Sequence, residues 1–385
     1  MKVVYPVSAL FFAAHATATA SRFNPRSYDP SASKFATCDA VKRTAVALSG
    51  SDVQVVDEEH VQIQLNYIDI NPGAKSAILM VHGWPADWST WSYQIEEFKD
   101  DYHLIVPSLR GFGKSSHPGD VRSSGTMQDM TRDLDCIMKH AGVEKAVCMG
   151  HDWGSQICYE AARARPDTIS AVIGVTIPYI PPANRDTFTP ISQLIPLFPN
   201  LGYQMVFDKQ TDKSIVELNH DVRRTLRALY RTAEDPTPTT FLSGKESFKG
   251  AYGDEEFSSI VFFTPEEEDY LVEQFEAQGF NYTLQFYTTE NRHHSWKFVQ
   301  QQGNWTLPQP VLTVYSTKDR VADWHHLNRF TGTAQYIPNW TTDTVAGAHW
   351  IHLENPEVFN NIVRKWLTEL DKEGKMKKER RTDEL

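Results

Sequence analysis

The sequence predicts an α/β fold in which a mostly parallel central sheet is flanked by helices and carries an inserted, mainly helical cap. Short runs rich in Val, Ile and Leu alternate with helical patterns, which is typical of a parallel sheet whose strands are joined by helices. A stretch crowded with prolines separates the earlier strands from the last one. The length of 385 residues and the 41% hydrophobic content can supply one large core with an inserted subdomain.

The strands are predicted from the hydrophobic runs, and the helices between them from apolar residues spaced three and four apart. Residues 126–140 place apolar side chains on one helical face, and Gly142 ends this helix. A second helix is expected to follow Gly154 and to end near Pro166. The predicted strands cover residues 61–70, 76–81, 103–107, 146–149, 171–176 and 311–316.

The proline-rich stretch begins at Pro178, and hydrophobic strand texture returns only near Pro310. We interpret the interval as a helical cap, because a lid inserted there can close over the strand ends at which α/β folds bind ligands. The predicted organisation is a signal peptide at 1–20, an N-terminal extension of open role at 21–50, the first part of the core at 51–177, the cap at 178–309, the second part of the core at 310–370 and a charged tail at 371–385.

Both ends of the chain predict a protein of the secretory pathway. Lys2, an apolar stretch and the small residues at 18–20 are typical of a signal peptide. The final residues, 382–385, read T-D-E-L and resemble the K-D-E-L class of retention signals. We therefore expect the lumen of the endoplasmic reticulum, with a retention receptor as partner, and secretion is the alternative. N-glycosylation motifs at Asn281, Asn304 and Asn339 agree with this compartment.

Charge argues against nucleic acid as the main ligand, and hydropathy argues against a transmembrane span. The net charge of −11 argues against nucleic acid, since phosphate binding needs a basic face. Beyond the first residues, no unbroken apolar run has membrane-spanning length. Oligomeric state cannot be read from the sequence.

Four cysteines in a chain of this length do not make a disulfide scaffold. Cys148 and Cys158 fall on an apolar strand and on the helix that follows it, where we expect buried free thiols. Cys38 and Cys136 stay unassigned.

An aspartate stands at the centre of the turn Gly150-His151-Asp152-Trp153-Gly154. The frame is the G-x-nucleophile-x-G turn of an α/β hydrolase, in which a serine is usual. A serine that attacked a saturated carbon would leave an ether, whereas an aspartate leaves an ester that a histidine-activated water can cleave. Asp152 therefore predicts displacement at an alkyl carbon.

Further segments complete the predicted site. The backbone N–H groups of Trp84, in His82-Gly83-Trp84-Pro85, and of Trp153 are expected to form an oxyanion hole, although a plain proline-closed turn is the alternative for the first. Asp319 follows an apolar strand and His349 comes later, which is the order of nucleophile, acid and histidine in this architecture. Asp319 would orient His349, which takes a proton from water.

With these motifs and Arg110-Gly111-Phe112-Gly113, the chain resembles the soluble type of epoxide hydrolase within the α/β-hydrolase family, from about residue 61 to 370. The resemblance implies a small hydrophobic epoxide as substrate, a vicinal diol as product and a covalent ester on Asp152. It implies no metal and no organic cofactor.

The resemblance also implies two cap tyrosines that hold the epoxide oxygen. Tyr203 resembles the first of them and Tyr287 the second, and both would bind substrate together with Trp153. A neutral phenol, with a pKa of about 10, can donate to an oxygen that is becoming an alkoxide. Tyr179 and Tyr282 are the fallback candidates.

A haloalkane dehalogenase is the main alternative, because such enzymes share the frame and the aspartate followed by tryptophan. A halide leaves already charged and needs only weak donors, whereas an alkoxide needs an acid. Trp84 stands where many dehalogenases carry a halide-binding asparagine, which favours the epoxide. A non-catalytic member of the fold that binds a hydrophobic ligand is a third possibility, which the intact set of nucleophile, acid and histidine argues against.

Overall fold

The computed structural model describes residues 21–27, 30–47, 52–181 and 186–372. Within these residues, the strands are β1 (Ser33–Ala47), β2 (Val53–Ile70), β3 (Ala77–Val81), β4 (His103–Pro107), β5 (Ala146–His151), β6 (Ile169–Val175), β7 (Val311–Ser316) and β8 (Trp340–Val345). They form one sheet in the order β1-β2-β4-β3-β5-β6-β7-β8. The pairs β1–β2 and β2–β4 are antiparallel, and every pair from β4 to β8 is parallel. The predicted mostly parallel α/β sheet is therefore confirmed.

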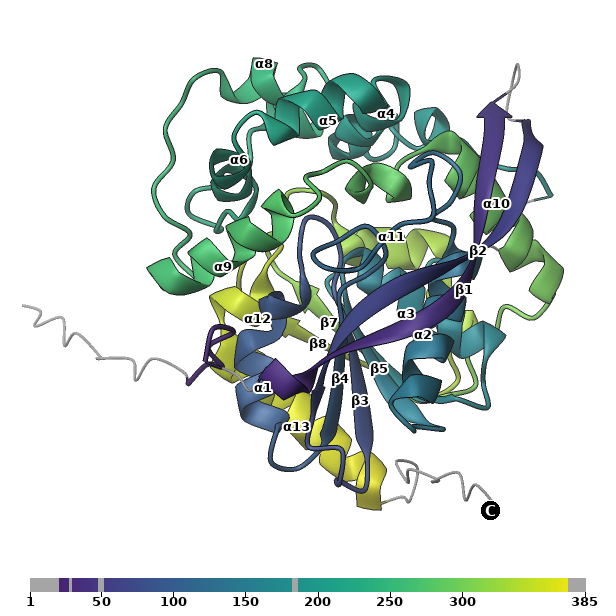
Figure 1. Cartoon of the computed structure of the whole chain (residues 1–385), viewed down its shortest axis with the longest axis vertical. Helices are drawn as coiled ribbons and strands as arrows, with labels where there is room; N and C mark the ends of the chain where they lie inside the picture. The colour runs from purple at the N-terminus through teal and green to yellow at the C-terminus, as the bar shows by residue number, and fades with distance from the viewer. Residues whose placement is uncertain (1–20, 28–29, 48–51, 182–185, 373–385) are drawn as a thin grey trace, which may run out of the picture.

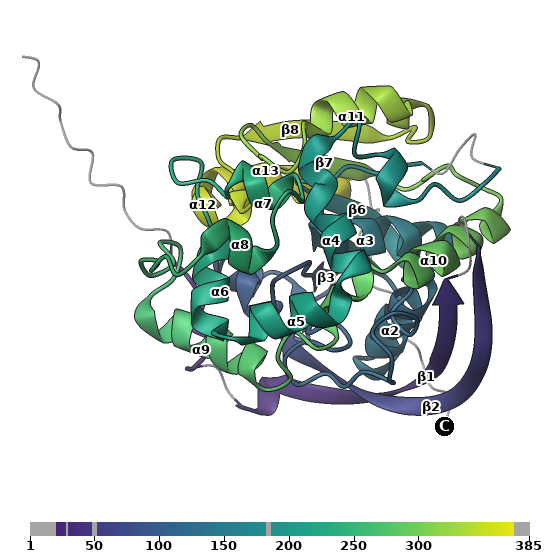
Figure 2. The same ribbon diagram turned by 90° about the horizontal axis from the view of Figure 1, so that it is seen from above.

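Helices cover both faces of this sheet, and a further group lies across one end of it (Figures 1 and 2). The core helices are α1 (Ser92–Phe98), α2 (Met127–His140), α3 (Trp153–Ala164), α11 (Trp324–Thr331), α12 (Ile351–Glu354) and α13 (Pro356–Lys372). Between β6 and β7 the chain forms α4 (Gly202–Lys209), α5 (Thr211–Asn219), α6 (Val222–Leu229), α7 (Thr239–Leu242), α8 (Phe248–Tyr252), α9 (Pro265–Glu276) and α10 (Thr289–Gln302).

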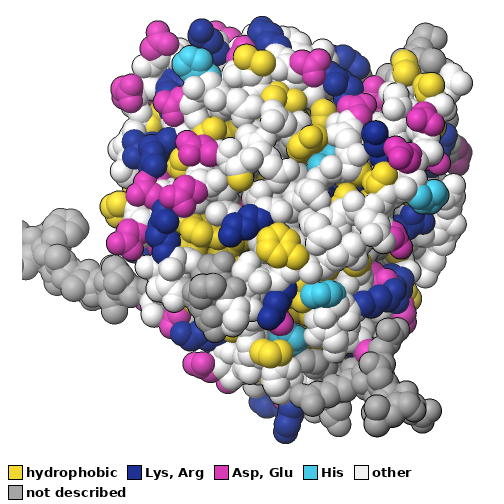
Figure 3. Space-filling model, viewed as in Figure 1, with side chains coloured by type: hydrophobic (Ala, Val, Ile, Leu, Met, Phe, Trp, Pro, Cys, Tyr) yellow, Lys and Arg dark blue, Asp and Glu magenta, His cyan; other side chains and the backbone are white. Residues whose placement is uncertain are grey.

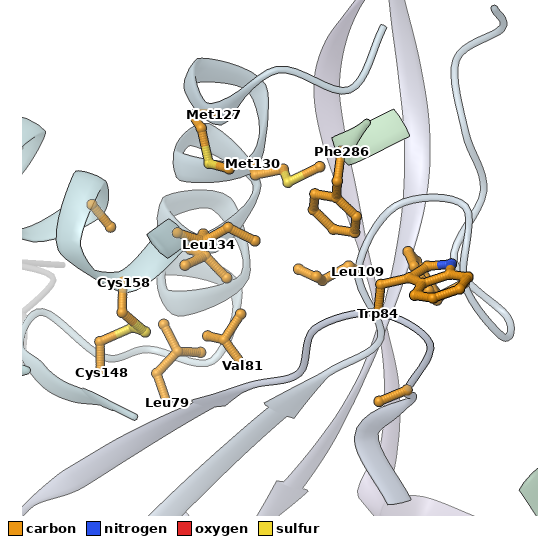
Figure 4. Packing of buried hydrophobic residues seen from close by; sticks show 14 of the residues in the cluster. Leu79, Val81, Trp84, Leu109, Met127, Met130, Leu134, Cys148, Cys158 and Phe286 are labelled. Carbon is orange, nitrogen blue, oxygen red and sulfur yellow. A yellow bond between two sulfur atoms is a disulfide. The ribbon is translucent and has the colours of Figure 1, made fainter. Parts of the chain in front are cut away.

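The sheet separates two hydrophobic cores. Side chains of a strand point alternately to opposite faces, so Leu79 and Val81 of β3 join the core under α2 and α3. Ile78 and Met80 join the other core, together with residues of α1 and α13. Figure 4 shows Leu79 and Val81 close to Leu134 of α2. Burial on both faces explains why this strand reads as an unbroken apolar run.

Helix α2 begins at a capping box and is tied to β1 by a buried ion pair. The side chain of Thr126 accepts from the N–H of Asp129, and the Asp129 carboxylate accepts from the N–H of Thr126. Arg43 of β1 donates to both oxygens of the same carboxylate, at 2.6 and 3.0 Å. The geometry is bidentate and buried, which fixes β1 against the helix.

Two strands of the sheet were not predicted from runs of Val, Ile and Leu. β1 lies in the predicted N-terminal extension, and its inward side chains are mostly small, such as Ala36, Cys38 and Ala40. β8 is rich in threonine and mostly exposed at the far edge of the sheet. Runs of Val, Ile and Leu mark fully buried strands, so an edge strand with small or polar side chains gives little signal.

The expectation of free thiols was wrong. Cys148 of β5 and Cys158 of α3 form a disulfide, and Cys38 of β1 forms another with Cys136 of α2. The sharp turn after β5 returns α3 onto the strand, so the Cα atoms of Cys148 and Cys158 lie 5.5 Å apart, within disulfide reach. Figure 4 shows this bond, which links β5 of the sheet to α3.

The surface is of mixed charge, and the described helices are not suited to crossing a bilayer. Figure 3 shows acidic and basic side chains interspersed over one face of the molecule. Among the described residues, no helix combines the length and the apolar character that a membrane span requires. The predicted signal peptide and residues 373–385 of the predicted tail lie outside the described residues.

Candidate active site

The candidate residues of the core lie at one edge of the sheet. Trp84 comes shortly after β3, Asp152 directly after β5, Asp319 after β7 and His349 after β8. These four strands are parallel, so their carboxyl ends meet at the same edge. This is where open α/β sheets bind their ligands.

Asp152 occupies a strained turn that only its neighbours permit. Its backbone has φ 55° and ψ −125°, a conformation that side-chain-bearing residues rarely adopt. A Cβ on Gly150 would lie 2.2 Å from the carbonyl oxygen of Gly154, and one on Gly154 would lie 2.1 Å from that of Val81. Both glycines are therefore required for the turn that projects the aspartate.

Two backbone N–H groups act on the Asp152 carboxylate. The N–H of Trp84 donates to Oδ1 at 3.0 Å, and a Cβ on Gly83 would come within 2.5 Å of the same oxygen. Burial raises the pKa of Asp152, while the charge of His349 and hydrogen bonds from the N–H groups of Trp84 and Trp153 lower it, and the net direction is upward. The two N–H groups predicted from sequence thus converge on the predicted nucleophile.

His349 lies between two carboxylates. Its Nδ1 donates to Oδ2 of Asp319 at 2.9 Å, and its Nε2 lies 3.6 Å from Oδ2 of Asp152. Burial lowers the pKa of His349, but the charge and hydrogen bond of Asp319 and the charge of Asp152 outweigh it and raise the pKa overall. Asp319 is held in turn by the N–H of Val321 at 2.8 Å and the indole N–H of Trp324 at 2.7 Å.

Sequence reasoning missed the groups that hold the backbone of His349. The Nε2 of His151 donates to the carbonyl oxygen of His349 at 2.9 Å, and the hydroxyl of Thr176 donates to it at 3.1 Å. His151 occupies a position of the nucleophile motif at which any residue is allowed, so the motif does not mark it. Thr176, directly after β6, carries no motif.

The two cap tyrosines lie next to each other. Tyr203 is on α4 and Tyr287 ends the short turn Thr283–Phe286, with ring centroids 5.8 Å apart. The ring of Tyr287 also lies 5.5 Å from that of Trp84 and 5.7 Å from that of Trp153. Burial raises the pKa of both phenols, and the charge of Asp152 raises it further. Both hydroxyls are therefore protonated at neutral pH.

Asp152 and Tyr203 line two cavities at once. The larger, of about 300 Å³, is mostly apolar, and its walls include Met127, Ile177, Phe198, Phe286, Trp296 and Leu327. The smaller, of about 70 Å³, is lined by Asp319 and His349 as well. Tyr287 is 1% exposed and lines neither cavity, although it packs directly on Tyr203. An apolar ligand in the larger cavity would therefore contact the Asp152 carboxylate, which also lines the smaller cavity.

The fallback tyrosines lie elsewhere. The hydroxyl of Tyr179 donates to the carbonyl oxygen of Trp305 at 2.9 Å, and Tyr282 stacks on His117 with ring centroids 4.5 Å apart. Neither lines a cavity that contains Asp152. The asparagines of the three glycosylation motifs, Asn281, Asn304 and Asn339, are exposed.

His82, at the start of the oxyanion turn, is a buried neutral histidine. Its Nδ1 donates to the carbonyl oxygen of Gly83, and its Nε2 accepts from the N–H of Leu109, both at 2.9 Å. Burial lowers the pKa of His82 to about 4, while the bond to Gly83 raises it slightly. The protonated form would lose the bond from Leu109.

We expect this histidine to make folding pH-dependent. Between pH 6.5 and pH 4 the unfolded chain, with a histidine pKa of about 6.5, binds a proton that His82 does not bind in the folded chain. The free energy of unfolding is therefore unaffected by the titration of His82 above pH 6.5 and is lower by about 3 kcal/mol at pH 4. Asp87 works in the opposite sense, because burial raises its pKa to about 7. The free energy of unfolding of the wild-type chain should therefore fall relative to that of His82→Gln as the pH drops from 6.5 to 4. Parallel curves for the two proteins in denaturant titrations would contradict this assignment.

The fold and site define the class of protein. Residues 76–356 match the family described as alpha/beta hydrolase fold, which is more than half of the chain, and the protein belongs to that family.

Among its relatives, the rat "Bifunctional epoxide hydrolase 2" is 26% identical over 312 residues, covering 79% of this chain and 53% of the rat protein. "Epoxide hydrolase A" of Mycobacterium tuberculosis is 24% identical, covering 80% of this chain and 95% of that protein. The crystal structure of epoxide hydrolase A from Mycobacterium thermoresistibile superposes with a TM-score of 0.65 at 23% identity, covering 85% of this chain and 98% of that one. The chain thus spans about half the length of the rat relative and nearly all of the mycobacterial ones.

Proposed function

We propose that the protein is an epoxide hydrolase that converts an epoxide and water to a vicinal diol. The observation that carries the proposal is the placement of Asp152 between the His349–Asp319 pair and Tyr203, at the wall of an apolar cavity. The names of the mammalian and mycobacterial relatives support the same reaction. No metal or organic cofactor enters the proposed reaction.

In the first step, the Asp152 carboxylate attacks a ring carbon of the epoxide and breaks the bond from that carbon to the ring oxygen. Oδ1 accepts from the Trp84 N–H, which leaves Oδ2 as the attacking oxygen. The new bond joins Oδ2 to a ring carbon, and the ring oxygen departs as an alkoxide that takes a proton from Tyr203 or Tyr287. The two phenols are protonated at neutral pH and thus able to act as the acid.

In the second step, water hydrolyses the ester. His349, oriented by Asp319, removes a proton from the water, whose oxygen attacks the carbonyl carbon of Asp152. The N–H groups of Trp84 and Trp153 stabilise the oxyanion on Oδ1. The intermediate collapses by breaking the bond between the carbonyl carbon and Oδ2, and the departing alkoxide takes the proton of the hydroxyl that water added, which releases the diol and restores the Asp152 carboxylate. The proton held by His349 returns through water to the phenolate formed in the first step.

Formation of the ester prepares the histidine for this role. The charge of Asp152 is one of the causes that raise the pKa of His349, and the ester carries no charge. The pKa of His349 therefore falls when Asp152 is alkylated, and the neutral imidazole that a general base requires becomes more populated. The base is favoured only after the nucleophile has reacted.

We also propose that residues 178–309 act as a cap that covers the site. They supply Tyr203 and Tyr287, and they contribute much of the wall of the larger cavity. The apolar lining favours a hydrophobic epoxide as substrate.

The proposal is tested by incubating the purified protein with a panel of epoxides and haloalkanes and measuring diol and halide separately. We expect diol from at least some epoxides and no halide above background. Halide release without diol formation would identify a dehalogenase, and inactivity toward both classes, with no covalent adduct, would favour a ligand-binding member of the fold.

The protein is further proposed to reside in the secretory pathway, in the lumen of the endoplasmic reticulum. Its two disulfides and the exposed asparagines of the three sequence motifs support an oxidising, glycosylating compartment. In cells that express the full chain, an endoglycosidase specific for high-mannose glycans should increase its mobility on gels. A protein that is insensitive to the enzyme and lies outside the membrane-enclosed fraction would contradict this location.

A further inference from the structure

We propose that Arg292 and Gln204 are positioning residues that aim the hydroxyl proton of Tyr203 at the epoxide oxygen. The inference rests on the proposed epoxide-opening reaction and assigns to it two residues that no motif marks. The three side chains form a hydrogen-bonded chain, Arg292–Gln204–Tyr203, which we call the arginine relay.

Each hydrogen bond of the relay is donated toward Tyr203. Nη2 of Arg292 donates to Oε1 of Gln204 at 2.7 Å, and Nε2 of Gln204 donates to the hydroxyl oxygen of Tyr203 at 3.3 Å. Nε of Arg292 is anchored on the carbonyl oxygen of Phe286 at 2.9 Å. All three side chains of the relay border the larger cavity.

The chemistry of arginine fixes the orientation of the amide. A guanidinium has donors only, so the acceptor oxygen of Gln204 must face Arg292 and the amide N–H must face Tyr203. The hydroxyl oxygen of Tyr203 then accepts from Gln204, and its own proton is left to point elsewhere. Since Tyr203 and Asp152 line the same cavities, that proton is available to an epoxide bound beside the nucleophile.

The positive charge of Arg292 is placed where negative charge develops. Its guanidinium lies 5.5 Å from the ring centroid of Trp153 and 5.9 Å from that of Tyr287. Among the described residues, no carboxylate lies within ion-pair distance of it. Asp208, whose charge raises the pKa of Arg292, accepts hydrogen bonds from the N–H and the hydroxyl of Thr289 and forms an ion pair with Lys209.

Burial lowers the pKa of Arg292, and the charged forms of Asp208, Tyr287 and Tyr203 raise it. The interaction is reciprocal, so the guanidinium favours a phenolate on either tyrosine. We therefore expect it to help the phenols to release a proton to the alkoxide during ring opening and to have little effect on ester hydrolysis at His349. An effect confined to the first step distinguishes the relay from a general structural role.

The experiment measures ester formation alone. In a His349→Gln background each protein molecule should form one ester and stop, so rapid quenching and mass spectrometry give the rate of the first step. We expect Arg292→Met to slow it tenfold or more, because a hydrogen bond to a charged group and a buried charge are lost. Arg292→Lys, which keeps the charge and a donor, should recover part of the rate. Lys297→Met, which removes an exposed cation from the same helix, serves as the matched control and should have no effect.

A double-mutant comparison tests whether the relay acts through Tyr203. Gln204→Leu should slow ester formation in the presence of Tyr203 and have little further effect in Tyr203→Phe, because the phenylalanine cannot receive the hydrogen bond. With His349 intact, Arg292→Met should leave the rate of ester hydrolysis within a fewfold of wild type, which also shows that the variant is folded.

The outcomes separate this inference from the proposed function. If the His349→Gln protein forms no adduct with any epoxide, the proposed function fails. If adducts form at the same rate with and without Arg292, or if Gln204→Leu slows the Tyr203→Phe protein as much as the parent, only the relay is refuted.

Discussion

The His349→Gln protein is expected to accumulate a covalent adduct whose mass exceeds that of the protein by the mass of the epoxide, and turnover should fall by about a thousandfold or more. The nucleophile and the cap tyrosines are untouched, so Asp152 can still open the ring. Glutamine cannot remove a proton from water, so the ester persists. The position of the Nε2 atom, 3.6 Å from Oδ2 of Asp152, places the missing base beside the ester that it would cleave.

Peptide mapping of the trapped protein should locate the adduct on Asp152. Asp152→Asn should form no adduct, since an amide is a poor nucleophile. His326→Gln, which alters an exposed histidine on α11, should turn over like the wild type. Undiminished turnover by His349→Gln, or an adduct on another residue, would exclude the proposed two-step reaction.

The sequence predicted the parts of the site that depend on local structure. The turn around Asp152 requires two glycines, because a side chain at either position would collide with the backbone. Such a constraint is visible in the sequence as a motif. Asp319 and His349 were identified by their order and by their places after strands. Parallel strands then bring the three residues together, so a correct fold was sufficient to place them.

What the sequence did not predict depends on contacts between distant segments. Gln204 and Arg292 meet across 88 positions of the chain, and Cys38 reaches Cys136 across 98. Neither contact leaves a local pattern, because each is decided by how a cap helix or an edge strand packs. Trp324 likewise holds Asp319 through its indole N–H, although no motif in the sequence marks it.

The Tyr203→Phe/Tyr287→Phe double variant should lose ring opening almost completely, with the first step slowed by about a thousandfold or more. An alkoxide is a poor leaving group, and the two phenols are the acids that we propose for it: Tyr203 lines the same cavities as Asp152, and Tyr287 packs on Tyr203. Each single variant should retain part of the rate, because the hydroxyls belong to adjacent rings and either can donate. The rate is measured as adduct formation in the His349→Gln background, so that a change in ester hydrolysis cannot mask it.

Tyr179→Phe and Tyr282→Phe are the matched controls. Each removes one phenolic hydroxyl that bonds or packs away from the cavities lined by Asp152, so ester formation should stay within a fewfold of the parent. If the double variant reacted at the parental rate while Tyr282→Phe did not, the acid would have been assigned to the wrong tyrosines. If all of the variants reacted at the parental rate, the leaving group would need no acid, as expected for a halide and not for an epoxide oxygen.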